Sequence, residues 1–107
     1  MEGKYSMIVS TCANKEQARK IAGLLVNKRL AACVQMFPVN SVYTWQERIC
    51  EEQEIMIFIK TRADLFDKVK REIKENHTYE VPEIIQISIE EGLPEYLKWM
   101  SDSTDGY

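Results

Sequence analysis

The chain has little of what most catalytic and metal centres are built from. It carries one histidine, three cysteines and four glycines in 107 residues. Cys12, Cys33 and Cys50 are 21 and 17 positions apart, which matches no zinc-binding spacing and includes no Cys-x-x-Cys pair. There is no Gly-rich loop to cradle a phosphate and no defensible Ser-His-Asp or Cys-His order. These absences predict a protein that is not an enzyme and has no obligatory cofactor.

Long apolar runs and clustered positive charge are also missing. No stretch approaches the roughly 20 apolar residues of a membrane span, and residues 1–5 lack the basic and apolar regions of a secretory signal. The net charge of −3 argues against nucleic acid as the main partner. An odd number of cysteines without a signal peptide indicates free thiols in a reducing compartment, so we expect a cytoplasmic protein.

The length fits a single domain over residues 1–107, with a core from about 4 to 100 and a polar, frayed tail over 101–107. Apolar runs bounded by turn signals predict four strands. The run 55–59 is apolar at both parities, as expected of a central strand covered on both faces. Pro38 indicates an edge strand or a bulge. The predicted strands are 4–11, 31–37 continuing as 39–45, 47–54 continuing through 55–59, and 84–90.

Helical spacing of apolar side chains predicts three helices. Asn14 is expected to cap the first, with Gln17 completing a capping box. Thr61 is expected to cap the second, and a short third helix is expected over residues 95–100. The apolar stripes of the first two helices are Ala18, Ile21, Ala22 and Leu25, and Leu65, Phe66, Val69 and Ile73.

The resulting order, β-α-β-β-α-β plus a helix, predicts an α+β, ferredoxin-like sandwich with an antiparallel four-stranded sheet. Right-handed crossovers place both helices on one face of this sheet. The strands over 55–59 and 84–89 also present apolar side chains to the other face, where they would form an exposed patch. We therefore expect a symmetric homo-oligomer, in which the long hairpin over 31–60 pairs with a neighbour's strand edges.

The segment 77–84 holds the only histidine, His77, together with Tyr79, Glu80 and Glu83. One interpretation is a divalent-metal site, in which the imidazole is joined by carboxylates or by the thiol of Cys12, at the end of the first strand. The other is a surface turn with a half-buried thiol. The two carboxylates are near enough for acid-base work, although such exposed pairs are usually only solvated. Composition leaves these alternatives open.

Aromatic side chains form a second group of candidates. Tyr43, Trp45 and Tyr79, with Trp99 on the last helix, combine apolar area with a polar atom and are of the types enriched at interfaces. They are expected either to pack between subunits or to line an inter-subunit cleft for a small ligand.

The chain resembles the CutA family of divalent-cation tolerance proteins over about residues 5–100. Five segments carry the resemblance in the family's order and spacing: 28–34, 41–45, 59–61, 77–84 and 96–99. The chain departs from the family pattern at Thr78, where proline is usual, and at Glu47, where glycine is usual. Some members are expected to bind metal through adjacent histidines and a cysteine; here only His77 matches, and Cys12 falls about one position from the matching slot.

The resemblance implies a homotrimer built by strand pairing and an association with Cu(II) or other divalent cations. It makes His77 the first candidate ligand and Cys12 the second, with the aromatic group at an inter-subunit cleft. Two other functions remain open: a PII-like trimeric sensor that binds a small ligand at the subunit clefts, and a scaffold that binds a partner protein.

Overall fold

The computed structural model describes residues 4–104, and the elements follow the predicted order. The four strands form one antiparallel sheet in the order β2-β3-β1-β4, which confirms the ferredoxin-like α+β class. The described elements are β1 (Tyr5–Cys12), α1 (Lys15–Asn27), β2 (Cys33–Trp45), β3 (Arg48–Arg62), a 3₁₀ turn η1 (Ala63–Leu65), α2 (Phe66–Asn76), β4 (Ile84–Ile89) and α3 (Pro94–Asp102).

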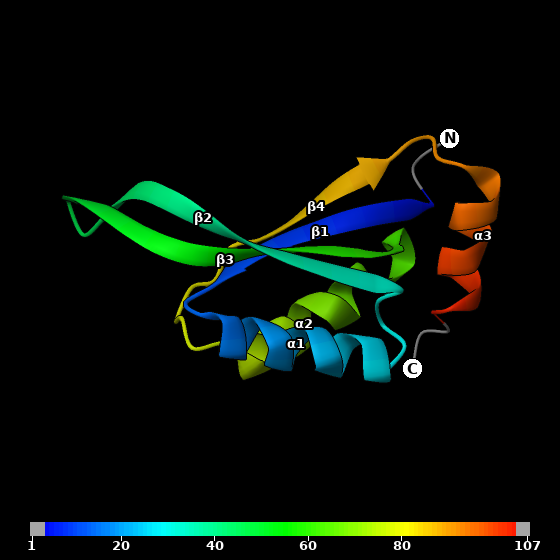
Figure 1. Cartoon of the computed structure of the whole chain (residues 1–107), viewed down its shortest axis with the longest axis horizontal. Helices are drawn as coiled ribbons and strands as arrows, with labels where there is room; N and C mark the ends of the chain where they lie inside the picture. Colours follow the sequence, from blue (N-terminus) through cyan, green and yellow to red (C-terminus); the bar gives the residue numbers. More distant parts are fainter. Residues whose placement is uncertain (1–3, 105–107) are drawn as a thin grey trace.

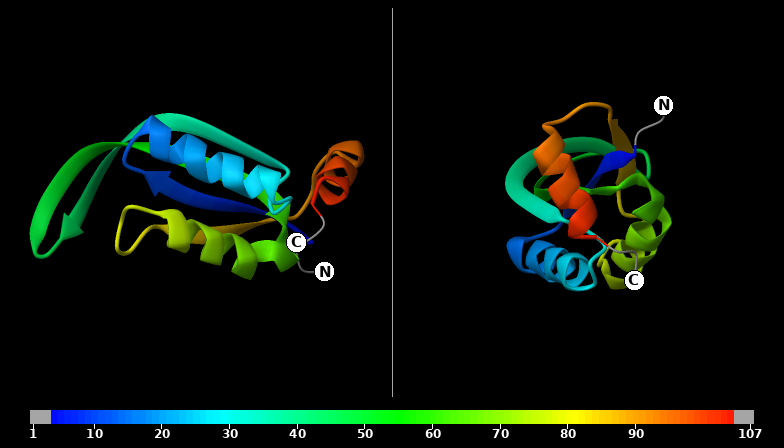
Figure 2. Two further views of the ribbon diagram at one scale, coloured as in Figure 1. Left: turned by 90° about the horizontal axis from the view of Figure 1, so that it is seen from below. Right: turned by 90° about the vertical axis from the view of Figure 1, so that its right-hand side faces the viewer.

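Helices α1 and α2 lie side by side over one face of the sheet (Figures 1 and 2). The core fills the space between these helices and strands β1 and β3, where Ile8, Ile57 and Ile59 are completely buried. Each buried isoleucine contributes about 1.5–3 kcal/mol relative to an exposed one. Among the described residues, no helix is both long enough and apolar enough to cross a membrane.

The N-terminus of α1 shows half of the predicted capping box. Asn14 has extended backbone geometry, and its Oδ1 accepts a hydrogen bond from the Gln17 amide at 2.8 Å, so the predicted cap is confirmed. The prediction for the Gln17 side chain is wrong, because this side chain does not return to the cap. It reaches instead to the end of α2 and the loop that follows, where it forms hydrogen bonds with Asn76 and Thr78.

The predicted cap at Thr61 is also wrong. β3 continues through Arg62 because this part of the strand pairs with β1, with Tyr5 opposite Arg62. The Thr61 hydroxyl is buried and donates to the Leu30 carbonyl at 2.7 Å, so it is not available to the helix. The helical segment begins instead through the 3₁₀ turn η1, and neither Arg62 nor Leu65 caps it with a side chain.

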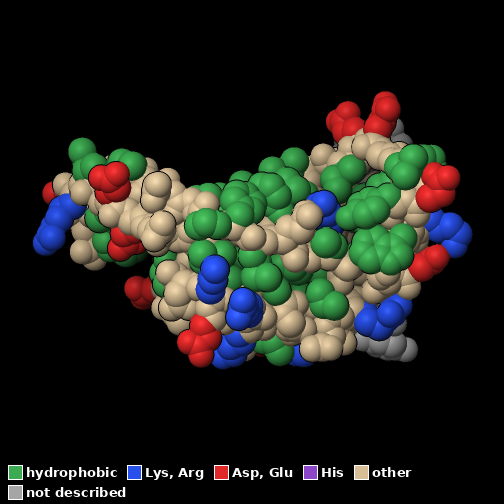
Figure 3. All heavy atoms as spheres, viewed as in Figure 1, with side chains coloured by type: hydrophobic (Ala, Val, Ile, Leu, Met, Phe, Trp, Pro, Cys, Tyr) green, Lys and Arg blue, Asp and Glu red, His purple; other side chains and the backbone are tan. Residues whose placement is uncertain are grey.

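The face of the sheet opposite α1 and α2 is largely uncovered, as predicted. On β4, Ile85 and Ile87 are 49% and 45% exposed, whereas Ile84 points to the helices and packs against the core. Hydrophobic side chains gather in a band from the middle of the sheet to α3 (Figure 3). Apolar surfaces of this kind are typical of contact sites and of ligand-binding grooves.

Helix α3 covers only one end of this face. Its Met100 is completely buried, and Ser101 shares a hydrogen bond of 2.9 Å with the Tyr5 hydroxyl. The helix extends through Asp102, and Thr104 is buried and bonded to the Met100 carbonyl at 2.8 Å. The predicted fraying from residue 101 is therefore wrong for 101–104, and residues 105–107 lie outside the described part.

The distal part of the β2–β3 hairpin, residues 39–54, projects from the sheet as an arm (Figure 1). The chain measures 44 × 26 × 22 Å, and the arm runs beyond the two helices (Figure 2). At its tip, Gln46 and Glu47 have φ of 51° and 66°, the left-handed geometry of a tight hairpin turn. Val42 and Ile49 are 67% and 82% exposed. A two-stranded hairpin is at best marginally stable alone in water, so the arm needs contacts beyond its own pair of strands.

Candidate functional site

The loop over residues 77–83 is fixed to the end of β1 by the ring of His77. Nε2 lies 2.7 Å from the Thr11 carbonyl oxygen, which can only accept, so Nε2 carries the proton. Nδ1 lies 3.0 Å from the Tyr79 amide nitrogen, which can only donate, so Nδ1 accepts. Both ring nitrogens of the one histidine are therefore engaged within the chain.

Gln17 fixes the same loop from the side of α1. Its Nε2 donates to the Asn76 carbonyl at 3.2 Å, and its Oε1 accepts from the amide and the hydroxyl of Thr78 at 3.1 and 2.7 Å. The side chain is buried, so these bonds are shielded from competing water. Thr78 thus supplies two donors, its amide and its hydroxyl, that a proline at this position would lack.

Two tyrosine–carboxylate pairs lie where the arm approaches the loop. Tyr79 of the loop donates its hydroxyl to Glu54 Oε2 at 2.7 Å, and Tyr43 on β2 donates to Glu52 Oε1 on β3 at 2.6 Å. Hydrogen bonds to a charged acceptor are short and strong. The bond to Glu52 raises the pKa of Tyr43 to about 12. Burial, followed by the bond to Glu54, raises the pKa of Tyr79 well above its usual value.

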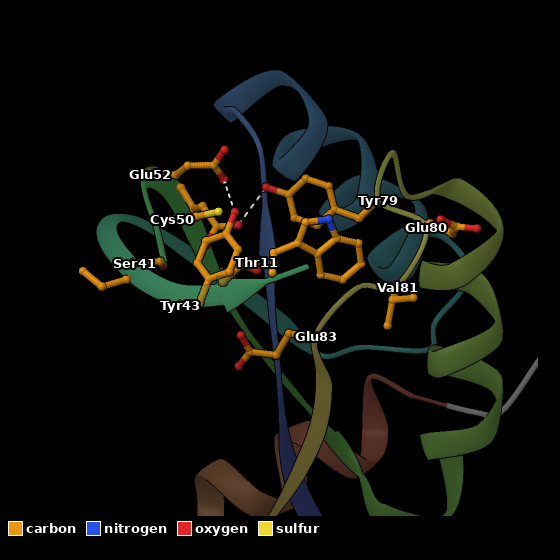
Figure 4. Close-up of a pocket in the computed structure, with 12 residues that line it drawn as sticks. Thr11, Ser41, Tyr43, Cys50, Glu52, Tyr79, Glu80, Val81 and Glu83 are labelled. Carbon is orange, nitrogen blue, oxygen red and sulfur yellow. Dashed lines mark hydrogen bonds between the residues drawn. The ribbon is translucent and has the colours of Figure 1, made fainter. Parts of the chain in front are cut away.

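A cleft of about 710 Å³ opens between the arm and the loop (Figure 4). In this view Glu52 and Glu83 lie on either side of Tyr43, while Glu80 lies beyond Tyr79. Four of the lining residues are glutamates, and none is lysine or arginine. The lining consists of Thr11, Ser41, Val42, Tyr43, Trp45, Cys50, Glu52, Glu54, Tyr79, Glu80, Val81 and Glu83.

Cys12 does not reach this cleft. Its thiol is completely buried in the core on the helix side of the sheet, whereas the preceding Thr11 lines the cleft. Burial, with a smaller contribution from the Glu54 charge, raises the pKa of Cys12 to about 11, so at neutral pH the group is a thiol. Among the described residues, no group of three or more histidine, cysteine, aspartate or glutamate side chains is arranged to hold a metal ion.

The remaining candidates divide between two places. Tyr43, Trp45 and Tyr79 come together at the cleft within one chain, and their predicted place between subunits stays a prediction. Trp99 does not: it lies on α3, against Tyr96 with ring centroids 5.4 Å apart, near the strand end at which β1 begins. It is 44% exposed and belongs to the apolar band of the uncovered face.

Glu52 and Glu54 were not singled out from the sequence. Both lie in a charged segment that reads as the solvated return of a hairpin. The sequence does show that the two glutamates are two residues apart, and this spacing places both side chains on one face of a strand. Their tyrosine partners become evident only from the pairing of β2 with β3 and from the path of the loop.

Comparison with known proteins identifies the family. Residues 6–103 match the family described as CutA1 divalent ion tolerance protein. The chain belongs to this family. The matched segment runs from β1 through α3, so it contains the arm, the loop and the cleft, and it confirms the resemblance seen in the sequence.

Similar proteins come from bacteria, archaea and plants. The divalent-cation tolerance protein CutA of Thermus thermophilus is 42% identical over 99 residues, which are 92% of this chain and 96% of that one. The structure of CutA1 from Oryza sativa matches with a TM-score of 0.94 at 36% identity, covering 99% of this chain and 98% of that one. The CutA of Archaeoglobus fulgidus, described as periplasmic, matches with a TM-score of 0.93 at 38% identity, covering 94% and 99%. The chain spans 56% of the chloroplastic rice relative. The descriptions of the Thermus and Archaeoglobus proteins name divalent-cation tolerance.

Proposed function

We propose that this protein is a homotrimer that contributes to divalent-cation tolerance by binding copper or a related divalent ion, without catalysis. Membership in the CutA1 family supports the tolerance role. The observation that carries the assembly is the apolar face that the chain leaves uncovered, together with an arm that has too few contacts of its own. Three copies related by symmetry would cover these surfaces by pairing each arm with a neighbour's strand edge.

The assembly is tested by placing a charge on the uncovered face. Ile85→Asp is expected to reduce the mass measured by light scattering from three chains to one, while circular dichroism keeps the wild-type spectrum. Glu90→Asp, a charge-conserving change just beyond β4, is the control and should leave the trimer intact. A wild-type protein that is monomeric and folded at micromolar concentration would contradict the assembly.

For the metal, we propose His77 as the principal ligand, with Glu80 and Glu83 of the same loop as oxygen donors. Imidazole and carboxylate together suit copper and related divalent ions. Binding at Nδ1 would displace the Tyr79 amide, so the affinity should be modest and coupled to movement of the loop. Cys12, the second ligand predicted from the sequence, is a weaker candidate, because its buried thiol would have to lose its proton.

Titration with Cu(II) tests this site. His77→Ala is expected to weaken copper binding by about tenfold or more, whereas Cys12→Ser should leave the affinity nearly unchanged. Equal affinities for wild type and His77→Ala would remove His77 from the site, and a loss confined to Cys12→Ser would place the metal in the core.

A second candidate function is that of a trimeric small-ligand sensor, because the cleft between arm and loop is of the size that small molecules occupy. A ligand at about 100 times its dissociation constant adds roughly 2.7 kcal/mol to the free energy of unfolding. A metabolite that stabilises the protein where copper does not would favour the sensor. A scaffold for a partner protein would be stabilised by neither. A cytoplasmic location completes the proposal, supported by three unpaired cysteines; cell fractionation tests it.

A further inference from the structure

The cleft between arm and loop carries more negative charge than its own structure balances. Its wall contains Glu52, Glu54, Glu80 and Glu83, and no lysine or arginine. Among the ion pairs of the described residues, none involves these four carboxylates. The site is therefore complementary to a cation.

Glu54 is the unusual member of the set. It is 7% exposed, and a carboxylate buried to this extent is normally paired with a positive charge. The only hydrogen bond of its side chain within the described part of the chain comes from the Tyr79 hydroxyl to Oε2. A neutral hydroxyl orients the carboxylate without neutralising it. The second oxygen, Oε1, remains available on a wall of the cleft.

The other lining residues distinguish between kinds of cation. Tyr43, Trp45 and Tyr79 present aromatic rings to the cleft, and aromatic rings attract weakly hydrated organic cations through their faces. A bare metal ion needs several donors that converge on one point, and in residues 4–104 no three histidine, cysteine, aspartate or glutamate side chains are so arranged unless the loop moves, as the metal proposal above requires. An organic ammonium ion, in contrast, matches carboxylates that are spread around an aromatic surface.

The spacing of the carboxylates favours a ligand with two positive charges over a ligand with one. Glu52 and Glu54 are two residues apart on β3 and lie on the same face, so their Cα atoms are about 7 Å apart. Each gives one oxygen to a tyrosine hydroxyl and keeps the other. The two ends of a short α,ω-diamine are separated by a comparable length.

We propose that this cleft binds an aliphatic diammonium ion. One ammonium group bonds to Glu54 in the buried part of the cleft and the other to Glu52, while the methylene chain lies against the aromatic rings. This assignment deepens the small-ligand alternative given above and does not depend on metal binding by His77.

Calorimetric titration of the full-length protein with 1,4-diaminobutane tests the proposal, with 1,4-butanediol as the uncharged probe of the same length. The diamine is expected to bind and the diol not, and binding should weaken with added salt. Glu54→Gln keeps an acceptor for the Tyr79 hydroxyl and should lower the affinity by about tenfold or more. Glu52→Gln should lower it less, and Glu75→Gln, which removes an exposed charge from α2, should not change it.

Several results would overturn the assignment. They are the absence of diamine binding to wild type, equal binding of diamine and diol, and equal losses in the Glu54 and Glu75 variants. A smaller assembly in Glu54→Gln with no diamine binding to wild type would show that a cationic side chain of a neighbouring copy fills the cleft. His77→Ala separates the two proposals: it should weaken copper binding and retain diamine binding, whereas unchanged copper binding would overturn the metal proposal alone.

Discussion

The arm consists of the outer parts of β2 and β3, whose inner parts belong to the four-stranded body of the molecule, and the two regions differ in almost every other respect. Over residues 55–61, β3 is internal to the sheet, and Ile57 and Ile59 are completely buried under the helices. Over 48–53, the same strand pairs only with β2, and Ile49 is 82% exposed. The body is stabilised by contacts within one chain. Over the arm, β3 pairs only with β2, and the proposed assembly would supply its further contacts.

The candidate site lies at the boundary between these two regions. Along β3, burial begins at Glu54, where the strand passes from the arm into the body. Its partner Tyr79 belongs to a loop that Gln17 and His77 fix to the body. Anything that moves the arm therefore changes the cleft, while the loop remains anchored. Experiments on the arm and on the body can test how differently the two regions are held in place.

The largest difference is expected in thiol reactivity. Cys50 lines the cleft on the arm, whereas Cys12 is buried in the body with its pKa raised to about 11. At pH 8, iodoacetamide should therefore modify Cys50 at least about 10³ times faster than Cys12, which reacts only when the chain unfolds. Mass spectrometry of peptides with and without guanidinium measures both rates. Comparable rates would contradict the burial of Cys12, and protection of both would show that a neighbour covers the arm.

The raised pKa of Cys12 also predicts how stability depends on pH. The folded value of about 11 exceeds the model-compound value of 9.0, so the contribution is fully present below pH 9 and is lost as pH rises through 11. Cys12→Ser, which does not ionise in this range, should lose less stability between pH 9 and 11 than wild type does.

The next largest effect is expected from removing apolar atoms. Ile57→Ala should lower the free energy of unfolding by about 2–5 kcal/mol at any protein concentration, because it leaves a cavity in the body. Ile49→Ala should cost less than Ile57→Ala, and its effect should depend on protein concentration because it acts through assembly. Denaturant titrations over a hundredfold range of concentration measure both. A concentration-independent loss at Ile49 equal to that at Ile57 would remove the distinction between body and arm.

A smaller effect is expected in the ionisation of the arm's tyrosine. The Tyr43 pKa of about 12 results mainly from its hydrogen bond to Glu52, so Glu52→Gln should shift the pKa toward the usual value of 10.0. Absorbance at high pH follows the tyrosinate directly, and Tyr43→Phe identifies the signal. Because the folded value is raised, the interaction stabilises the protein below pH 10 and is lost as pH rises through 12. An unchanged titration in Glu52→Gln would contradict this hydrogen bond.

The smallest effect is expected at the tip of the arm. Glu47 has φ of 66°, a conformation that glycine adopts without steric cost, so Glu47→Gly should raise the free energy of unfolding by about 1 kcal/mol or less. Glu51→Gly, in the paired part of β3, should lower the free energy of unfolding by about 0.5–1 kcal/mol. Thermal unfolding of the two variants gives the comparison. A loss in both would show that the turn gains nothing from glycine.

The fold could be predicted because its signals are local and periodic. The alternation of apolar side chains over residues 55–59 and 84–89 predicted that both faces of the sheet carry apolar residues. Asn14 predicted where α1 begins. The predictions failed where a polar side chain had two possible partners. Thr61 resembles a helix cap, but its hydroxyl is taken by the Leu30 carbonyl, and Gln17 resembles half of a capping box, but it bonds to the loop at Thr78.

The site was predicted less completely because it depends on contacts between distant segments. Tyr43, Trp45 and Tyr79 were found by residue type, but Glu54 acquires its importance only from a hydrogen bond to a residue 25 positions away. Cys12 shows the reverse problem. Its place at a strand end suggested an accessible thiolate. Adjacent residues of a strand point to opposite faces of the sheet, so Cys12 lies in the core while Thr11 faces the cleft.

Neither tryptophan of this chain lies in the body. Trp45 is on the arm and 49% exposed, and Trp99 is on α3 and 44% exposed. Tryptophan fluorescence thus originates from two exposed sites, with one indole on the arm and one on α3. Replacing either tryptophan by phenylalanine leaves a single tryptophan. Changes in the solvent exposure of the arm and of α3 can then be followed separately, without any attached dye.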